Sequence, residues 1–160
     1  MDFEQVMHHE NISFEGIESP YFLLGLLSAF DNRFQAAADK LIGEMSWKQF
    51  FAVICISMFR QPPGLKELAQ VMGTSHQNLK QILLKLEKKG FVLLKEDAKD
   101  KRKQRVHLTE KCLAFCKKND EVSAQVMQQL FGGISPEEMQ TTIRTIMQME
   151  NNLKGLGEIQ

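Results

Sequence analysis

Apolar residues recur at helical spacing along most of the chain, which predicts a mainly α-helical protein. A Ser-Pro pair at positions 19 and 20 opens the first long helix, with the serine as N-cap and the proline as first helical residue, and Gly43 ends it. A second helix is predicted from Trp47 to about Phe59, opened by a capping box of Ser46 and Gln49. Because this second helix is apolar on nearly all sides, we expect it to be central and buried.

The middle of the chain has the pattern of two short helices joined by a tight turn. A proline-rich break precedes a helix predicted from about Leu65 to Met72, with its apolar residues on one face. Gly73 ends this helix, and Thr74 or Ser75 caps a following helix that runs to about Lys89. A turn of this length is typical of a helix-turn-helix pair.

A β-hairpin is predicted next, followed by two helices. The segment 91–95 is short and apolar, the segment 104–108 alternates polar and apolar residues, and the charged stretch 96–103 joins them. A helix capped by Thr109 is predicted to run to about residue 131. The last helix, opened by a capping box at Ser135, is predicted to run to about residue 153. The predicted fold class is mainly α with a small β-wing, a winged helix-turn-helix with N- and C-terminal helices.

Charge is distributed unevenly along a chain that is neutral as a whole. The 160 residues contain 20 Lys and Arg and 20 Asp and Glu. Residues 80–118 hold 13 basic and five acidic side chains, a net charge of +8, and the rest of the chain carries −8. This asymmetry indicates a polyanionic partner, most often nucleic acid, with a solvated lysine-rich face as the alternative.

Composition disfavours several other classes of protein. Apolar residues make up 43% of the chain, but no apolar run approaches the roughly 20 residues of a membrane-spanning helix, and the N-terminus lacks the basic segment of a secretory signal. The three cysteines form no Cys-x-x-Cys motif and indicate a reducing, cytoplasmic compartment. We find no nucleophile–base pair, glycine-rich phosphate loop or metal-ligand cluster. We therefore expect no enzyme activity, no cofactor and no metal.

Motifs in the helix-turn-helix and the wing resemble the MarR family of winged-helix transcription regulators. They are Leu65–Ala69, Met72–Ser75, Leu86–Val92, and the wing from Asp97 to Thr109, where the family pattern is Asp-Pro-x-Asp-Arg-Arg, three residues, Val-x-Leu-Thr. The resemblance covers about residues 20–153. The chain departs from the pattern at Ala98, Lys101, Gln81 and Cys112, where the family usually has Pro, Arg, Arg and Gly.

The resemblance implies a sequence-specific transcription regulator that binds double-stranded DNA as a homodimer through its terminal helices. It implies a division into an N-terminal extension and dimerisation helix (1–45), a DNA-binding module (46–108) and C-terminal dimerisation helices (109–160). Intramolecular packing of the terminal helices is the alternative. Repression is the expected mode, with an activator or a protein-binding winged-helix module as alternatives. Members of the family release DNA on binding a small effector or on thiol oxidation. The sequence names no effector, and Cys112 and Cys116 form either a redox pair or two core thiols.

The second helix of the pair is the predicted recognition helix. Its apolar stripe is expected to face inward, which leaves a polar face for DNA. The candidate DNA-binding residues there are Thr74, Ser75, His76, Gln77, Asn78, Lys80, Gln81 and Lys85. Asn and Gln can bond adenine edges and Lys can donate to guanine, so we expect base reading by His76, Gln77, Asn78 and Gln81. Ser75 and the helix N-terminus are expected to anchor a phosphate, and Thr74 and Gln77 have the spacing of a capping box.

The wing loop supplies a second set of candidate DNA-binding residues. They are Lys99, Asp100, Lys101, Arg102 and Lys103. A basic loop can enter the minor groove, where the potential is most negative. The resemblance makes Arg102 the inserting residue, and we expect Asp100 to pair with its guanidinium. The alternative is a solvated charged turn.

Overall fold

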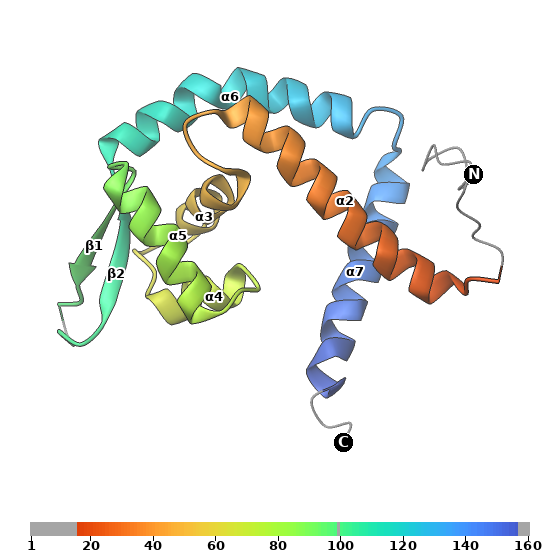
Figure 1. Cartoon of the computed structure of the whole chain (residues 1–160), viewed down its shortest axis with the longest axis horizontal. Helices are drawn as coiled ribbons and strands as arrows, with labels where there is room; N and C mark the ends of the chain where they lie inside the picture. Colours follow the sequence, from red (N-terminus) through yellow and green to blue (C-terminus); the bar gives the residue numbers. More distant parts are fainter. Residues whose placement is uncertain (1–15, 99, 157–160) are drawn as a thin grey trace. The chain divides into compact units, whose positions relative to one another are not determined.

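The computed structural model describes residues 16–98 and 100–156, and in that part of the chain it contains six helices and one two-stranded sheet (Figure 1). In chain order these are α2 (Ser19–Ile42), α3 (Trp47–Ser57), α4 (Leu65–Val71), α5 (His76–Lys88), β1 (Val92–Glu96), β2 (Gln104–Leu108), α6 (Glu110–Leu130) and α7 (Pro136–Leu156). The predicted mainly α class with a β-wing is confirmed. No helix in this part of the chain is long and apolar enough to span a membrane.

Local capping explains where several helices begin. The Ser46 hydroxyl accepts from the Gln49 backbone N–H at 3.3 Å, and the Gln49 side chain accepts from the Ser46 N–H at 3.2 Å. Ser135 and Glu138 form the same reciprocal pair before α7. Two of the three predicted capping boxes are therefore confirmed. Such a box satisfies two backbone donors that the first turn of a helix leaves without partners.

One predicted helix start is wrong by one residue, and of the two caps predicted for α5, Ser75 is confirmed and Thr74 is not. Ser19 is not the N-cap of α2 but its first residue, and Glu18 is the cap, without a side-chain hydrogen bond. The capping box of Thr74 and Gln77 does not form, because α5 begins at His76 and its N-cap is Ser75, whose hydroxyl accepts from the Asn78 N–H at 3.2 Å. The cap must stand directly before the first helical residue, so its partner lies three positions after residue 75.

The helix α3 is the centre of the core, as predicted. It contacts α2, α4, α5 and β2, and Ala52, Val53, Cys55 and Ile56 on it are buried. It ends at Ser57, two residues earlier than predicted, with Met58 as C-cap. The burial of α3 fixes the position of the helices and strands around it.

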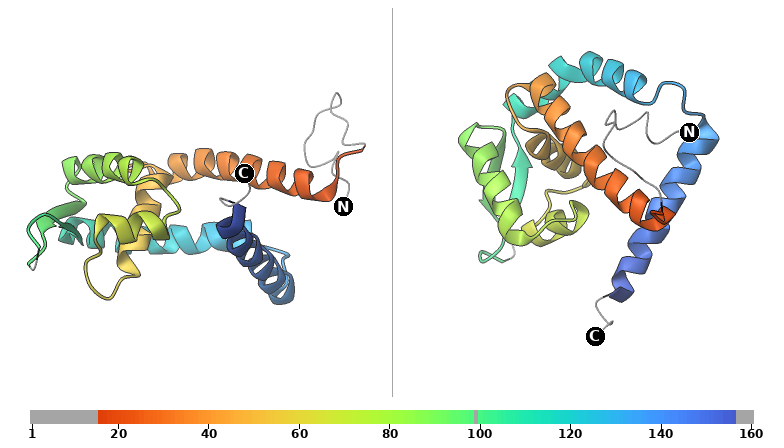
Figure 2. Two further views of the ribbon diagram at one scale, coloured as in Figure 1. Left: turned by 90° about the horizontal axis from the view of Figure 1, so that it is seen from below. Right: turned by 45° about the vertical axis from the view of Figure 1, so that its right-hand side comes forward.

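The two strands form an antiparallel hairpin beside α5, and its loop projects beyond that helix (Figure 2). The pairing runs from Val92 with Leu108 to Glu96 with Gln104. The first strand begins one residue later than predicted, because the Phe91 N–H bonds to the Leu86 carbonyl at 2.9 Å and closes the end of α5. The strand β2 also meets the segment before α4, where the Val106 N–H donates to the Pro63 carbonyl at 3.0 Å.

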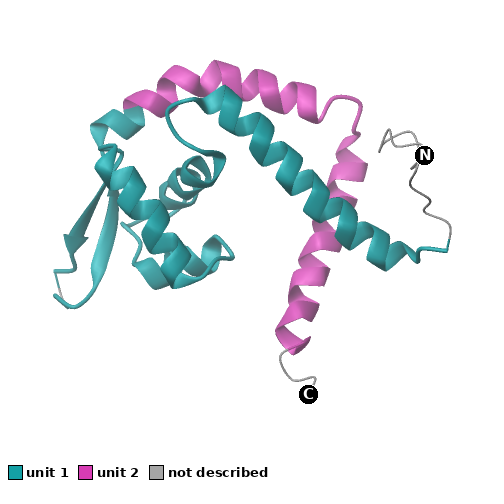
Figure 3. Cartoon of the chain, in the orientation of Figure 1, with its two compact units in different colours: residues 1–113 teal, residues 114–160 magenta. Residues whose placement is uncertain are grey.

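The chain divides into two compact units, Met1–Leu113 and Ala114–Gln160 (Figure 3). The first unit contains the helix-turn-helix and the hairpin. The second contains most of α6 and all of α7, and α7 has no buried residue. The three-part division at residues 45 and 108 stays a prediction.

Candidate nucleic-acid interface

The helix α5 presents one apolar and one polar face. Leu79, Ile82, Leu83 and Leu86 are buried, which confirms the predicted inward stripe. The turn before the helix needs Gly73, whose φ of 60° lies in the left-handed region. This turn brings α5 against α4 and leaves the opposite face of α5 in solvent.

The first turn of α5 is organised by short-range hydrogen bonds. Asn78 donates from its side-chain amide to the Thr74 hydroxyl at 2.7 Å, and its backbone N–H donates to Ser75. Thr74 is half-buried, whereas Ser75 and Asn78 are exposed. The amide nitrogen of Asn78 is therefore already engaged within the protein.

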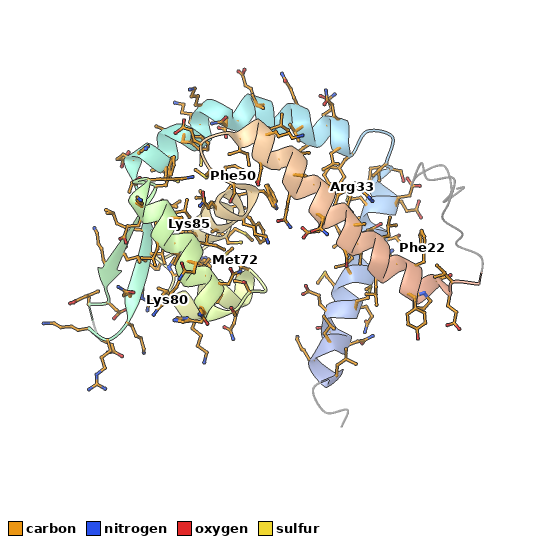
Figure 4. All side chains as sticks on the ribbon, viewed as in Figure 1. Phe22, Arg33, Phe50, Met72, Lys80 and Lys85 are labelled. Atoms are coloured by element: carbon orange, nitrogen blue, oxygen red, sulfur yellow. The ribbon has the colours of Figure 1, made fainter. Side chains whose placement is uncertain are left out.

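The other predicted residues of α5 are exposed on its polar face. They are His76, Gln77, Lys80, Gln81 and Lys85. Figure 4 shows Lys80 on the half of α5 nearer the tip of the hairpin and Lys85 farther along the helix. The structure thus brings the predicted recognition residues onto one solvent-facing surface.

The wing loop is tied by its own acidic residues. The Asp97 side chain accepts from the Asp100 N–H at 3.0 Å, and the Asp97 N–H donates to the Lys103 carbonyl at 2.9 Å. The Asp100 carboxylate accepts from the Arg102 N–H at 3.1 Å. These bonds close the loop into a defined turn.

One expectation for the wing is wrong. Asp100 forms its ion pair with the Lys103 ammonium, at 3.3 Å, and not with the Arg102 guanidinium. The backbone turn places residue 103 beside Asp100, since the Lys103 N–H also donates to the Asp100 carbonyl at 2.8 Å. Arg102 and Lys101 are exposed, and Lys99 lies outside the described residues.

Arg105 joins the wing to the start of α4, a role the sequence did not reveal. Its Nε donates to the Asp97 carboxylate at 2.6 Å, and its Nη1 lies 3.2 Å from both the Pro62 carbonyl and the Glu67 carboxylate. The hydrogen bond to Asp97 raises the pKa of Arg105 above its ordinary value, and the charges of Asp97 and Glu67 act in the same direction. Asp97 thus bonds both the loop and Arg105, so one carboxylate holds the wing together.

A basic hollow of about 420 Å³, here called the wing hollow, lies between α4, α5 and β2. Its charged lining residues are Lys66, Glu67, Lys80, Arg102, Lys103 and Arg105, and His76 also lines it. Lys66 and Arg105 were not among the predicted site residues. The one sequence signal for Arg105 was its position in the basic segment 80–118, and Lys66 lies outside that segment. Five of the lining side chains are Lys or Arg and one is Glu, so the hollow attracts anions.

A second hollow of about 480 Å³, here called the aromatic hollow, lies between α2, α3 and the turn before α5. Phe34, Trp47, Phe51 and Met72 line it together with polar groups that include Thr74 and Asn78. The rings of Phe34 and Trp47 meet edge to face with centroids 4.7 Å apart. Asp31, Gln35 and Lys48 also line this hollow, so polar and apolar groups share its wall.

The fold and this surface define the class of the protein. A helix-turn-helix with a solvated second helix, followed by a two-stranded basic wing, is a winged helix-turn-helix domain. Residues 45–103 match the model of the MarR family. This segment therefore matches the MarR family of winged helix-turn-helix transcription regulators, in agreement with the sequence resemblance. This family and fold are those of regulators and not of enzymes.

Known proteins agree with this assignment. The chain is 27% identical over 124 residues to the HTH-type transcriptional regulator YkoM of Bacillus subtilis, covering 75% of this chain and 80% of that protein. The organohalide-sensing regulator RdhR-CbdbA1625 in its 2,4-dichlorophenol-bound form has a similar fold (TM-score 0.78, 20% identity, 91% and 87% of the two chains). So does MepR of S. aureus in its DNA complex (TM-score 0.73, 16% identity, 85% and 98%).

Proposed function

We propose that this protein is a sequence-specific DNA-binding transcription regulator that acts as a homodimer on a palindromic promoter site. The observation that carries the proposal is the solvated polar face of α5 next to a basic wing, within a segment of net charge +8. Repression would follow from occupying the promoter and excluding polymerase. A cytoplasmic location is part of the same proposal, because a transcription regulator acts where its promoter DNA lies.

The recognition helix is assigned the reading of base edges in the major groove. His76, Gln77 and Gln81 are exposed along it, and an amide can bond adenine at two atoms, each good pair contributing about 1–3 kcal/mol of discrimination. Asn78 is the weaker candidate of the predicted set because its amide nitrogen bonds to Thr74. Ser75 and Lys85 are assigned to phosphates.

The wing is assigned to the neighbouring minor groove. Arg102 is exposed at the loop and has no ion pair among the described residues, so its guanidinium is available to the groove. Lys101 lies beside it and adds positive charge. Asp100 acts on Arg102 through the backbone, by accepting its N–H.

A homodimer is supported by the uncovered apolar surface of the terminal helices. Within α7, Ile143, Ile146, Met147 and Leu153 are 39–60% exposed. In α2, Tyr21 and Leu24 are also exposed. Contiguous exposed apolar stripes are typical of association sites, and a two-fold dimer matches a palindrome.

A small-molecule effector would fit the aromatic hollow. Its wall includes Thr74 and Asn78, the two side chains that bond at the start of the recognition helix. An aromatic ligand with one polar group would therefore touch both the core and the DNA-reading element. The 2,4-dichlorophenol bound to the similar regulator RdhR-CbdbA1625 is a ligand of this chemical type.

Selection from a random duplex pool tests the proposal. The tightest binders should share a palindrome with half-sites about one helical turn apart. Fluorescence anisotropy at two salt concentrations should show that the affinity for this site falls steeply as salt rises. We expect Arg102→Ala to weaken binding to all sequences, and Gln77→Ala to relax preference at one or two base pairs. Absent or salt-insensitive binding would instead favour the protein-binding module. Placing the selected site within or upstream of a reporter promoter separates repressor from activator.

A further inference from the structure

Three of the cations that line the wing hollow form no ion pair with any other described residue. Arg105 is paired with Asp97 and Glu67, and Lys103 is paired with Asp100. In the part of the chain that the structure describes, Lys66, Lys80 and Arg102 have no ion pair, although all three line the same hollow. Positive groups that share a hollow repel each other, and an anion placed between them removes that cost.

These cations come from three different elements that meet only in the fold. Lys66 is in the first turn of α4, Lys80 is one turn into α5 on the side of the hairpin, and Arg102 is in the wing loop. The hollow therefore lies between the element assigned to the major groove and the element assigned to the minor groove. One sugar-phosphate strand separates two neighbouring grooves of a duplex, and this strand must pass between α5 and the wing.

We propose that the wing hollow receives a backbone phosphate of this strand, and that Lys66 and Lys80 are the side chains that contact it. The inference rests on the proposed function and adds to it Lys66, a DNA contact outside the recognition helix and the wing loop. It also assigns Lys80 to a phosphate and not to a guanine edge. An ammonium on a flexible stem suits a phosphate oxygen, because it acts as a point charge without the planar fork that reads bases.

The walls of the hollow are held in place by the Arg105 network. Glu67 accepts from the Gly64 N–H at 2.8 Å and from Arg105, so the start of α4 and the strand β2 share one carboxylate. A Cβ on Gly64 would lie 3.3 Å from the Glu67 carboxylate, which shows how closely the backbone approaches this pair. This network thereby holds the start of α4, which carries Lys66, next to the strand that leads from the wing loop.

The salt dependence of DNA affinity tests the contact. Lys66→Gln and Lys80→Gln should each reduce the slope of log affinity against log salt by about 0.9 per protomer, with the preferred sequence unchanged. Lys88→Gln is the matched control, since Lys88 is an exposed lysine of α5 that does not line the hollow. A changed base preference in Lys80→Gln with an unchanged slope would return Lys80 to base reading and overturn its assignment here.

A phosphate scan of the selected duplex locates the partner. Methylphosphonate replaces each backbone phosphate in turn with a neutral group, and one position should weaken the original protein but not Lys66→Gln, because the contact is already lost. Two results together would contradict this: Lys66→Gln binds the duplex with the salt slope of the original protein, and every methylphosphonate position weakens both proteins equally. In that case the inference is wrong while the proposed function stands. If no duplex binds at all, both fail.

Inorganic phosphate serves as the probe for a free phosphate compound. We expect no saturable binding below millimolar concentration in the absence of DNA. Binding in that range that Lys66→Gln abolishes, together with an unchanged duplex slope, would assign the hollow to a small phosphate ligand and overturn the DNA assignment.

Discussion

The helices α5 and α7 have the same kind of amphipathic sequence but different surroundings. In α5 the four apolar residues of the stripe are at most 8% exposed. In α7 the comparable residues Ile143, Ile146 and Met147 are 42%, 39% and 60% exposed, and no residue is buried. An apolar stripe predicts that a helix needs a partner, but it does not tell whether that partner belongs to the same chain.

This difference separates two sources of stability. The helix α5 closes a core that includes α3, α4 and both strands, so its apolar residues stabilise the fold of a single chain. The stripe of α7 would contribute only when a second copy covers it.

The largest effect is expected from removing core volume under the recognition helix. Leu83 is completely buried, so Leu83→Ala should reduce the free energy of unfolding by about 2–5 kcal/mol. Its neighbour Leu84 is 52% exposed, and Leu84→Ala is the matched control, expected to cost well under half as much. Urea unfolding followed by circular dichroism measures both. Equal losses for the two variants would contradict the assignment of α5 to an intrachain core.

A charge in the α7 stripe is expected to act on association. Ile143→Asp should convert a dimer of twice 18.4 kDa to a monomer in analytical ultracentrifugation, because a carboxylate cannot be buried there unpaired. Loss of the second half-site should weaken affinity for the palindrome by about 100-fold or more. Thr145→Asp places the same charge on the opposite face of α7 and should leave the dimer intact. A monomeric original protein, or a dimeric Ile143→Asp, would assign the stripe to another use.

The same distinction between local and distant partners explains what the sequence could predict. Capping boxes at Ser46 and Ser135 were predictable because both partners lie three residues apart, and the α5 stripe was predictable from its period. The wrong pairing of Asp100 with Arg102 arose from a backbone turn that sequence spacing does not describe.

Partners far apart in sequence were not predictable. Arg105 bonds to groups 38 and 43 positions away, and nothing in its local pattern separates it from a solvated strand residue. Lys89 likewise reaches the buried Gln49, 40 positions earlier, and ties the end of α5 to the start of α3. Lys66 joined the candidate site only when the fold placed α4 beside the wing.

A smaller effect is expected from loosening the wing. Arg105→Gln should weaken DNA binding by roughly tenfold, the size expected for one charge-assisted hydrogen bond, and should speed protease cleavage within residues 97–103. Arg105→Lys keeps the charge but cannot donate to Asp97 and Glu67 with the geometry of a guanidinium, so it should restore binding only in part. Complete restoration by lysine would show that the charge alone matters and that the wing needs no such support.

The smallest effect is expected at the start of α7. Hydrogen bonds from the backbone and side chain of Ser135 lower the pKa of Glu138 below its ordinary value of 4.5. A lowered pKa in the folded state contributes stability above the ordinary value, and this contribution is lost as the pH falls through the lowered pKa. Because the side chain is exposed, Glu138→Gln should change the melting temperature by about 2 °C or less at neutral pH. Below pH 4.5, the melting temperature of the variant should decrease less steeply with falling pH than that of the original protein. Thermal melts between pH 3 and 7 measure this, and Glu137→Gln, one residue earlier in the same turn, is the control.

The pH effect of Glu138→Gln also depends on whether a second copy covers α7. If it does, the weaker pH dependence of the melting temperature should be clear in the dimer. It should be lost when Ile143→Asp is added, since an uncovered α7 melts apart from the core.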